Sequence, residues 1–149
     1  MFSCLLISKT GAVADHELLK MFPRQAPRGG HEIHPDTLAP GQDILTSDGP
    51  NDYREVAGTS FAQPFISGVI ALMLQVNPNL TTVEVKKILV ETSVPLIGYT
   101  EKDQGSGQIQ PLLAVALASY LNNKAKGMAL AKRLGIKQQV FDIASKWKE

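Results

Sequence analysis

The longest apolar stretch of the chain covers residues 60–76 and is nonpolar on nearly every face of a helical wheel. That pattern is typical of a helix buried on all sides rather than of a surface helix. The helix is expected to end at Asn77, because a residue that precedes proline is pushed out of the helical region. Small residues on one face predict that a neighbouring backbone approaches closely there: Ser67, Gly68 and Ala71.

An amphipathic pattern follows, with a capping signal in front of it. Thr81 and Glu84 have the spacing of a capping box, in which each side chain satisfies a backbone N–H of the other residue. The helix after Thr81 is expected to stop before Pro95. Its apolar face, suited to packing on a sheet, consists of Val85, Ile88, Leu89 and Thr92.

Shorter apolar runs predict strands. Residues 2–7 suggest a short buried strand, residues 43–46 a brief strand after a turn, and residues 53–57 a strand-like approach to the long helix. Gly41 is expected to supply a positive φ in the turn before residue 43. Pro111 at a helix start precedes an apolar run over 112–121. Strands and buried helices in this order indicate an α/β fold.

The last part of the chain differs in charge. Residues 122–149 carry seven Lys or Arg and two Asp or Glu, against eight and twelve in residues 1–121, although the whole chain has a net charge of only +1. An apolar stripe over residues 136–147 predicts a basic amphipathic helix. Such a helix can bind a membrane surface or an acidic partner, or pack on its own domain, which is the commoner case. Nucleic-acid binding is not expected, because the segment lacks a recognised reading motif.

Composition is that of an ordinary globular domain, with 44% hydrophobic and 19% charged residues. The single cysteine, Cys4, cannot form an internal disulfide. The cysteine content therefore does not indicate whether the protein works in an oxidising or a reducing compartment. We expect no transmembrane segment and no signal peptide. Zinc-ligand spacing and a glycine-rich phosphate loop are both lacking from the sequence, and we expect no metal or cofactor.

The candidate catalytic residues lie at the start of the long helix, in the stretch Gly58-Thr-Ser-Phe-Ala-Gln-Pro-Phe-Ile-Ser-Gly68. Ser60 lies at the predicted helix N-terminus, where unpaired N–H groups and the helix dipole favour a developing anion. Serine there is also a preferred N-cap, which requires no catalytic role. A nucleophile and a cap both fit the position.

The stretch resembles the nucleophile motif of the subtilisin-like serine proteases, Gly-Thr-Ser-x-Ala-x-Pro-x-x-x-Gly. All six fixed positions match: Gly58, Thr59, Ser60, Ala62, Pro64 and Gly68. Residues 6–13, 35–41 and 105–109 resemble further elements of that family, so the likeness covers about residues 5–118. It implies a subtilisin-like α/β fold with a mainly parallel sheet flanked by helices. Residues 1–121 would be the C-terminal part of the catalytic domain, and 122–149 a basic helical tail.

The resemblance further implies a serine endopeptidase acting on protein or peptide substrates, with Ser60 as nucleophile and its backbone N–H as an oxyanion donor. The family's Asp-Ser/Thr-Gly and His-Gly-Thr motifs do not occur in this sequence. No general base or aspartate is therefore identified, and the chain alone is expected to be an inefficient peptidase. It is expected to aggregate, associate or need the N-terminal part of such a domain as a partner.

All three histidines fall in the polar segment 14–37: His16, His31 and His34. They are interpreted as solvated loop residues, because neighbours in a loop do not imply the geometry that catalysis needs. The alternative to an endopeptidase is an inactive subtilase domain, retained as a binding or scaffold module or as a non-functional fragment. For a complete protein the family implies export from the cytoplasm, whereas this sequence leaves localisation open.

Overall fold

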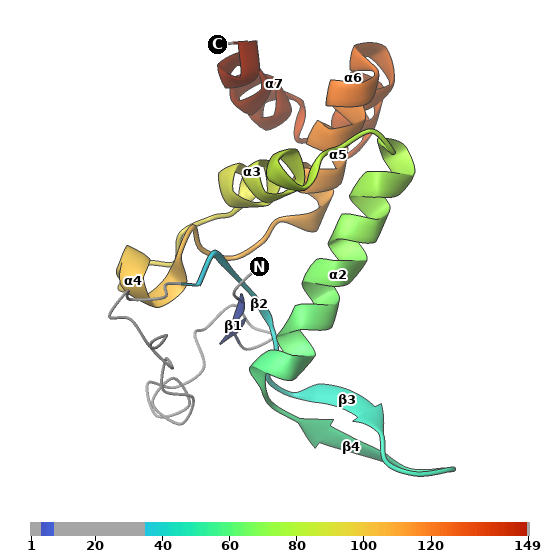
Figure 1. Ribbon diagram of the computed structural model, residues 1–149, viewed down its shortest axis with the longest axis vertical. Coiled ribbons are helices and arrows are strands. Elements are labelled where there is room, and N and C mark those ends of the chain that lie inside the picture. The colour runs from blue at the N-terminus through green and yellow to red at the C-terminus, as the bar shows by residue number, and fades with distance from the viewer. Residues whose placement is uncertain (1–3, 8–34, 149) are drawn as a thin grey trace. The chain divides into compact units, whose positions relative to one another are not determined.

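The computed structural model describes residues 4–7 and 35–148 (Figure 1). The chain divides into two compact units, Met1–Ile66 with Pro95–Gln108 and Ser67–Val94 with Ile109–Glu149. The strands are β1 (Cys4–Ile7), β2 (Thr37–Pro40), β3 (Ile44–Ser47) and β4 (Tyr53–Val56). The helices are α2 (Thr59–Val76), α3 (Thr82–Thr92), α4 (Glu101–Gln104), α5 (Pro111–Asn122), α6 (Lys124–Arg133), α7 (Lys137–Ser145) and the 3₁₀ turn η1 (Lys146–Lys148).

The first unit is built around β2, which pairs in parallel with β1. On its other side, the N–H of Leu38 donates to the carbonyl of Gly107 at 2.8 Å, and the hydroxyl of Thr37 donates to the same carbonyl at 2.7 Å. The strand expected over residues 105–109 is thus reduced to a single parallel bridge between Leu38 and Gln108. Leu38 is fully buried, which places β2 in the core. The α/β class predicted from the sequence is confirmed, with short strands and abundant helix.

Gly105 holds the loop after α4 against the start of β2. Its φ is +60°, and a Cβ there would lie 2.0 Å from the carbonyl oxygen of Pro35. Beside it, the Ser106 N–H and hydroxyl both donate to the Asp36 carbonyl, at 3.1 and 2.7 Å. Only glycine fits this close approach of two backbones.

The predicted turn and approach to the long helix form an antiparallel hairpin of β3 and β4, with Ile44 opposite Val56. The expectation that Gly41 adopts a positive φ is wrong, because Asp43 takes the left-handed conformation instead, with φ 54°. Aspartate tolerates that region better than most residues, since its short side chain can bond locally. Gly41 serves a different purpose: its carbonyl accepts the N–H of Gly58 at 2.8 Å.

Helix α2 begins and ends where the sequence predicts, but its burial differs. Only one stripe is buried, formed by Ala62, Ile66, Val69 and Met73, whereas Phe65 and Leu72 are 44% and 50% exposed. A Cβ at Gly68 would meet nothing within 4 Å, so no backbone of the described residues packs on the small-residue face. Burial depends on what surrounds a helix, and an apolar sequence does not determine which of its faces is covered.

Helix α2 is also long and apolar enough, by length and composition alone, to cross a bilayer. Core helices of globular domains meet the same criterion, so the property does not assign α2 to a membrane.

The second unit packs α3, α6 and α7 around α5. The predicted apolar face of α3 is confirmed, because Val85, Ile88, Leu89 and Thr92 are its buried residues. The basic tail forms two helices, and both contact α5 through buried residues such as Ala131 and Val140. The tail therefore packs on its own unit, which is the commoner case for a helix of this pattern.

Helices α5 and α6 approach each other closely at Gly127. A Cβ on this residue would lie 2.2 Å from the backbone nitrogen and Cα of Tyr120. Real Cβ contacts are essentially never that short, so any side chain at residue 127 would push the two helices apart.

The capping box at the start of α3 is present and gives a first prediction. The N–H of Thr81 donates to the Glu84 carboxylate at 2.8 Å, and the N–H of Glu84 donates to the Thr81 hydroxyl at 3.2 Å. Thr81→Ala should lower the free energy of unfolding by about 1 kcal/mol at neutral pH. Thr81→Ser retains the capping hydroxyl, so it should retain most of this contribution. Urea titration followed by circular dichroism measures both.

This difference should depend on pH. The hydrogen bonds from the Thr81 backbone and hydroxyl lower the pKa of Glu84 below its usual 4.5. A carboxyl group whose pKa is lower in the folded than in the unfolded protein stabilises the fold at pH values above its unfolded-state pKa. This stabilisation is lost as the pH falls through the folded-state pKa. The gap between wild type and Thr81→Ala should therefore narrow below about pH 4. A gap that stays constant through that range would contradict the role of the ionised carboxylate.

Candidate active site

Ser60 is the second residue of α2 and its side chain is exposed. The turn before it is fixed by Gly58, which is buried and donates its N–H to the Gly41 carbonyl at 2.8 Å. The Gly58 carbonyl in turn accepts the N–H groups of Phe61 and Ala62, at 3.0 and 3.3 Å. Within the part of the chain that the structure describes, no group accepts the N–H of Ser60. The site therefore offers a hydroxyl and an unused N–H side by side.

The other motif residues support this turn in different ways. Ala62 is fully buried and anchors the first turn of α2 in the core. Pro64 is exposed and is the sixth residue of α2, so it lies in the second turn of the helix. Because proline has no N–H, the carbonyl of Ser60 lacks the i+4 bond that an ordinary helix would give it. Thr59 is half-buried and begins α2.

This arrangement suits the stabilisation of an anion. The first N–H groups of a helix have no intrahelical partner, and the dipole adds partial positive charge there. An oxygen that becomes negative next to Ser60 could accept a hydrogen bond from the Ser60 N–H, which would not have to break another hydrogen bond first. A simple N-cap role fits less well, because the residue that accepts the first-turn N–H groups is Gly58.

No histidine belongs to residues 4–7 or 35–148, since His16, His31 and His34 all lie outside the described residues. The structure therefore brings no general base to Ser60 among the residues it describes. In the same part of the chain, no cluster of three or more His, Cys, Asp or Glu side chains is placed to hold a metal ion.

Two features were not foreseen from the sequence. The side-chain oxygen of Gln42, next to the Gly41 carbonyl that anchors the site, is buried and without a partner among the described residues. In the second unit, the indole of Trp147 donates to Glu91, which is 56 residues away in the chain. The residues around Gln42 and Trp147 in the sequence give no indication of the buried amide oxygen or of the bond to Glu91.

Comparison with known proteins identifies close similarity to one family. The model of the subtilase family matches residues 9–131. Subtilisin-like protease 1 of Plasmodium vivax is 35% identical over 86 residues, which cover 58% of this chain and 14% of that protein. Bacillopeptidase F of Bacillus subtilis is 35% identical over 124 residues, covering 79% of this chain and 9% of that protein.

Among solved structures, the CspB protease of Clostridium perfringens superposes with a TM-score of 0.51 at 27% identity, covering 58% of this chain and 20% of that chain. The chain thus spans between 9% and 20% of the length of these three proteins. All three are named as proteases or peptidases, and the matched region of this chain includes Ser60.

Proposed function

The chain belongs to the subtilase family of serine peptidases, and on that premise we propose that it carries the nucleophile of a serine endopeptidase, Ser60. The chain would act on protein or peptide substrates together with a histidine and an aspartate that are not among its described residues. The N-terminal part of a subtilase catalytic domain is the partner that would supply them.

One observation carries the proposal. The complete six-position motif lies at an exposed helix N-terminus, where the Ser60 hydroxyl is accessible and the Ser60 N–H has no competing acceptor among the described residues. A nucleophile requires the first property and an oxyanion donor the second. The bond from Gly58 to Gly41 and the burial of Ala62 hold both groups in place.

The proposed reaction has two steps. The Ser60 oxygen attacks the scissile carbonyl carbon while the histidine takes the hydroxyl proton, and the carbonyl oxygen becomes an anion that accepts the Ser60 N–H. Collapse of this intermediate breaks the C–N bond, and the amine leaves with the proton from the histidine. Water then attacks the acyl-enzyme by the same route and releases the acid. The reaction requires no metal or redox cofactor.

A fluorophosphonate probe, which phosphonylates activated serines, tests the assignment. Incubation of the chain with the probe, alone and mixed with the N-terminal part of a subtilase catalytic domain, is followed by peptide mass spectrometry. We expect the adduct on Ser60 and much faster labelling in the mixture, because the general base activates the hydroxyl. Ser60→Ala should abolish the adduct, and Ser47→Ala, which removes an exposed serine of β3, should leave it unchanged.

Absence of an adduct in both samples would overturn the nucleophile assignment. The chain would then be a subtilase domain without catalytic function, acting as a binding or scaffold module or not at all. Labelling at other serines but not at Ser60 would overturn the assignment equally, because it would show that the probe reacts without regard to the motif.

A further inference from the structure

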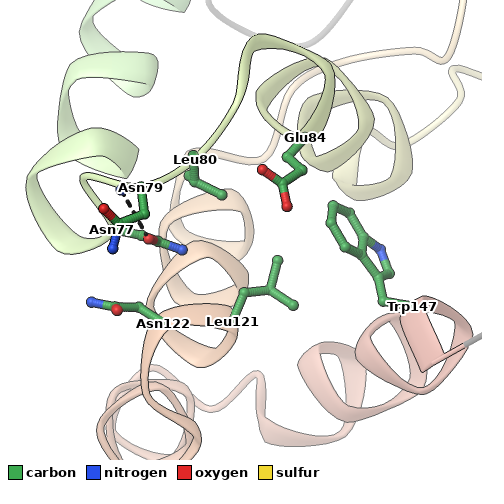
Figure 2. Close-up of a pocket in the computed structure, with 7 residues that line it drawn as sticks. All are labelled: Asn77, Asn79, Leu80, Glu84, Leu121, Asn122 and Trp147. Atoms are coloured by element: carbon green, nitrogen blue, oxygen red, sulfur yellow. Dashed lines mark hydrogen bonds between the residues drawn. The ribbon is translucent and has the colours of Figure 1, made fainter.

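The second unit contains a pocket of about 400 Å³ that takes no part in the site at Ser60 (Figure 2). Its walls come from the segment before α3, from α3 itself, from the end of α5 and from η1. The lining residues are Asn77, Asn79, Leu80, Glu84, Leu121, Asn122 and Trp147. We propose that this pocket binds the basic side chain of a lysine or arginine residue in a polypeptide.

The charge of the lining favours a cation. Glu84 is the only residue of the lining with a formal charge. Both hydrogen bonds from the Thr81 N–H and hydroxyl go to the same carboxylate oxygen, Oε2, so Oε1 keeps its capacity to accept. Among the described residues, no lysine or arginine forms an ion pair with Glu84. The capping box also keeps this carboxyl ionised, since it lowers its pKa.

Trp147 supplies an aromatic wall whose position is fixed. Its indole N–H donates to Glu91, and the ammonium of Lys87 lies 4.4 Å from the ring centre. Lys87 also pairs with Glu91 at 3.8 Å, so its charge is largely balanced by a neighbour outside the pocket lining. Indole rings attract cations through their electron-rich faces. The contact with Lys87 is an example of this attraction within the same unit.

The asparagines at the opposite end are held in place by bonds from their amide groups to the backbone. The amide nitrogen of Asn77 donates to the Ala118 carbonyl at 3.2 Å, and that of Asn122 donates to the Val76 carbonyl at 2.8 Å. Each NH₂ group thereby uses one of its two N–H donors on the backbone, and the amide oxygens remain able to accept. The Asn77 oxygen accepts only a long bond from the Asn79 N–H, at 3.4 Å.

Shape selects among cations. In Figure 2 Glu84 and Trp147 stand on one side of the gap and the asparagines on the other, with Leu80 and Leu121 between them. Lysine and arginine combine an apolar stem, which can pack on leucines, with a head that carries several donors and no acceptor. The cavity volume is in the range of pockets that hold small ligands. An anion would be repelled by the Glu84 carboxylate, the only charged group of the lining.

The single tryptophan of the chain makes the test direct, because Trp147 lines the pocket and is the only source of indole fluorescence. The full chain is titrated with the N-acetyl methylamides of lysine, arginine, norleucine and glutamate. We expect a saturable change in fluorescence with the first two. Norleucine has a stem like that of lysine without the charge, and it should bind at least ten-fold more weakly or not at all.

Glu84→Gln tests the electrostatic part. Glutamine keeps the side-chain acceptor that the capping box requires, so the helix start should survive. The variant should bind the lysine derivative at least five-fold more weakly. Glu55→Gln, which removes an exposed carboxylate from β4 in the other unit, should bind as wild type does.

Each of the following results would overturn the proposal: equal binding of norleucine and lysine derivatives, tighter binding of glutamate, or unchanged affinity in Glu84→Gln. The comparison of ligands on the wild-type chain needs no variant, so it decides the matter even where Glu84→Gln fails to fold. If fluorescence does not respond, the side-chain amide NMR signals of Asn77 and Asn122 are followed instead, and their constancy would also overturn it.

Discussion

Replacing Ser60 with alanine is expected to lower kcat for peptide hydrolysis by about 10⁶-fold, the loss seen when the serine of subtilisin is removed. The measurement uses this chain joined to the N-terminal part of a subtilase catalytic domain, so that a histidine and an aspartate are supplied. A fluorogenic peptide substrate reports the rate. The loss should appear in kcat, with KM little changed, because alanine keeps the backbone N–H and removes only the attacking oxygen.

The matched control is Ser47→Ala, an exposed serine of the same unit outside the motif, which should keep activity within about two-fold. The chain by itself should hydrolyse the peptide no faster than the Ser60→Ala form of the joined domain, because effects of triad residues are far from additive. Activity of the joined domain that survives Ser60→Ala would contradict the assignment of the nucleophile.

Gly127→Ala is expected to lower stability more than alanine at Gly68 or Gly135, the other glycines of the second unit. The added Cβ would fall 2.2 Å from Tyr120 backbone atoms, which cannot move without shifting α5. Overpacking of this kind costs about 3 kcal/mol of stability. The better helix propensity of alanine offsets roughly 1 kcal/mol of this cost. The net loss should be roughly 2 kcal/mol, which lowers Tm by about 5 °C.

Gly68→Ala is the matched control, because it places the same methyl group in the interior of another helix where nothing lies within 4 Å. It should raise stability by roughly 0.5–1 kcal/mol through helix propensity alone. Thermal unfolding followed by circular dichroism compares the two variants. Equal shifts of Tm in both would show that α5 and α6 do not meet as closely at Gly127 as the structure places them.

Local signals in the sequence were sufficient for several elements. The capping box of Thr81 and Glu84 and the buried face of α3 depend on residues three or four apart, and both are confirmed. The strands β3 and β4 were predicted from short runs of residues, whereas their antiparallel pairing was not. Each of these features is decided within one or two turns of backbone, which a pattern of side chains can encode.

Features that join distant residues could not be predicted in this way. The contact of Gly105 with Pro35 spans 70 residues and that of Trp147 with Glu91 spans 56, so no periodicity reveals them. The burial of α2 was overestimated for the same reason, because an apolar sequence does not state which of its faces is covered. The proposed nucleophile, Ser60, could be selected because its motif is local, whereas a general base for it would depend on the three-dimensional arrangement of distant segments.

Helix α2 runs without interruption from the first unit into the second, which divide between Ile66 and Ser67. Helix formation is cooperative, so neither half of α2 can melt without removing hydrogen bonds at the junction of the two halves. Loss of α2 would thus remove helical hydrogen bonds from residues of both units. Melting of α2 would therefore also remove the helix start at which Ser60 lies.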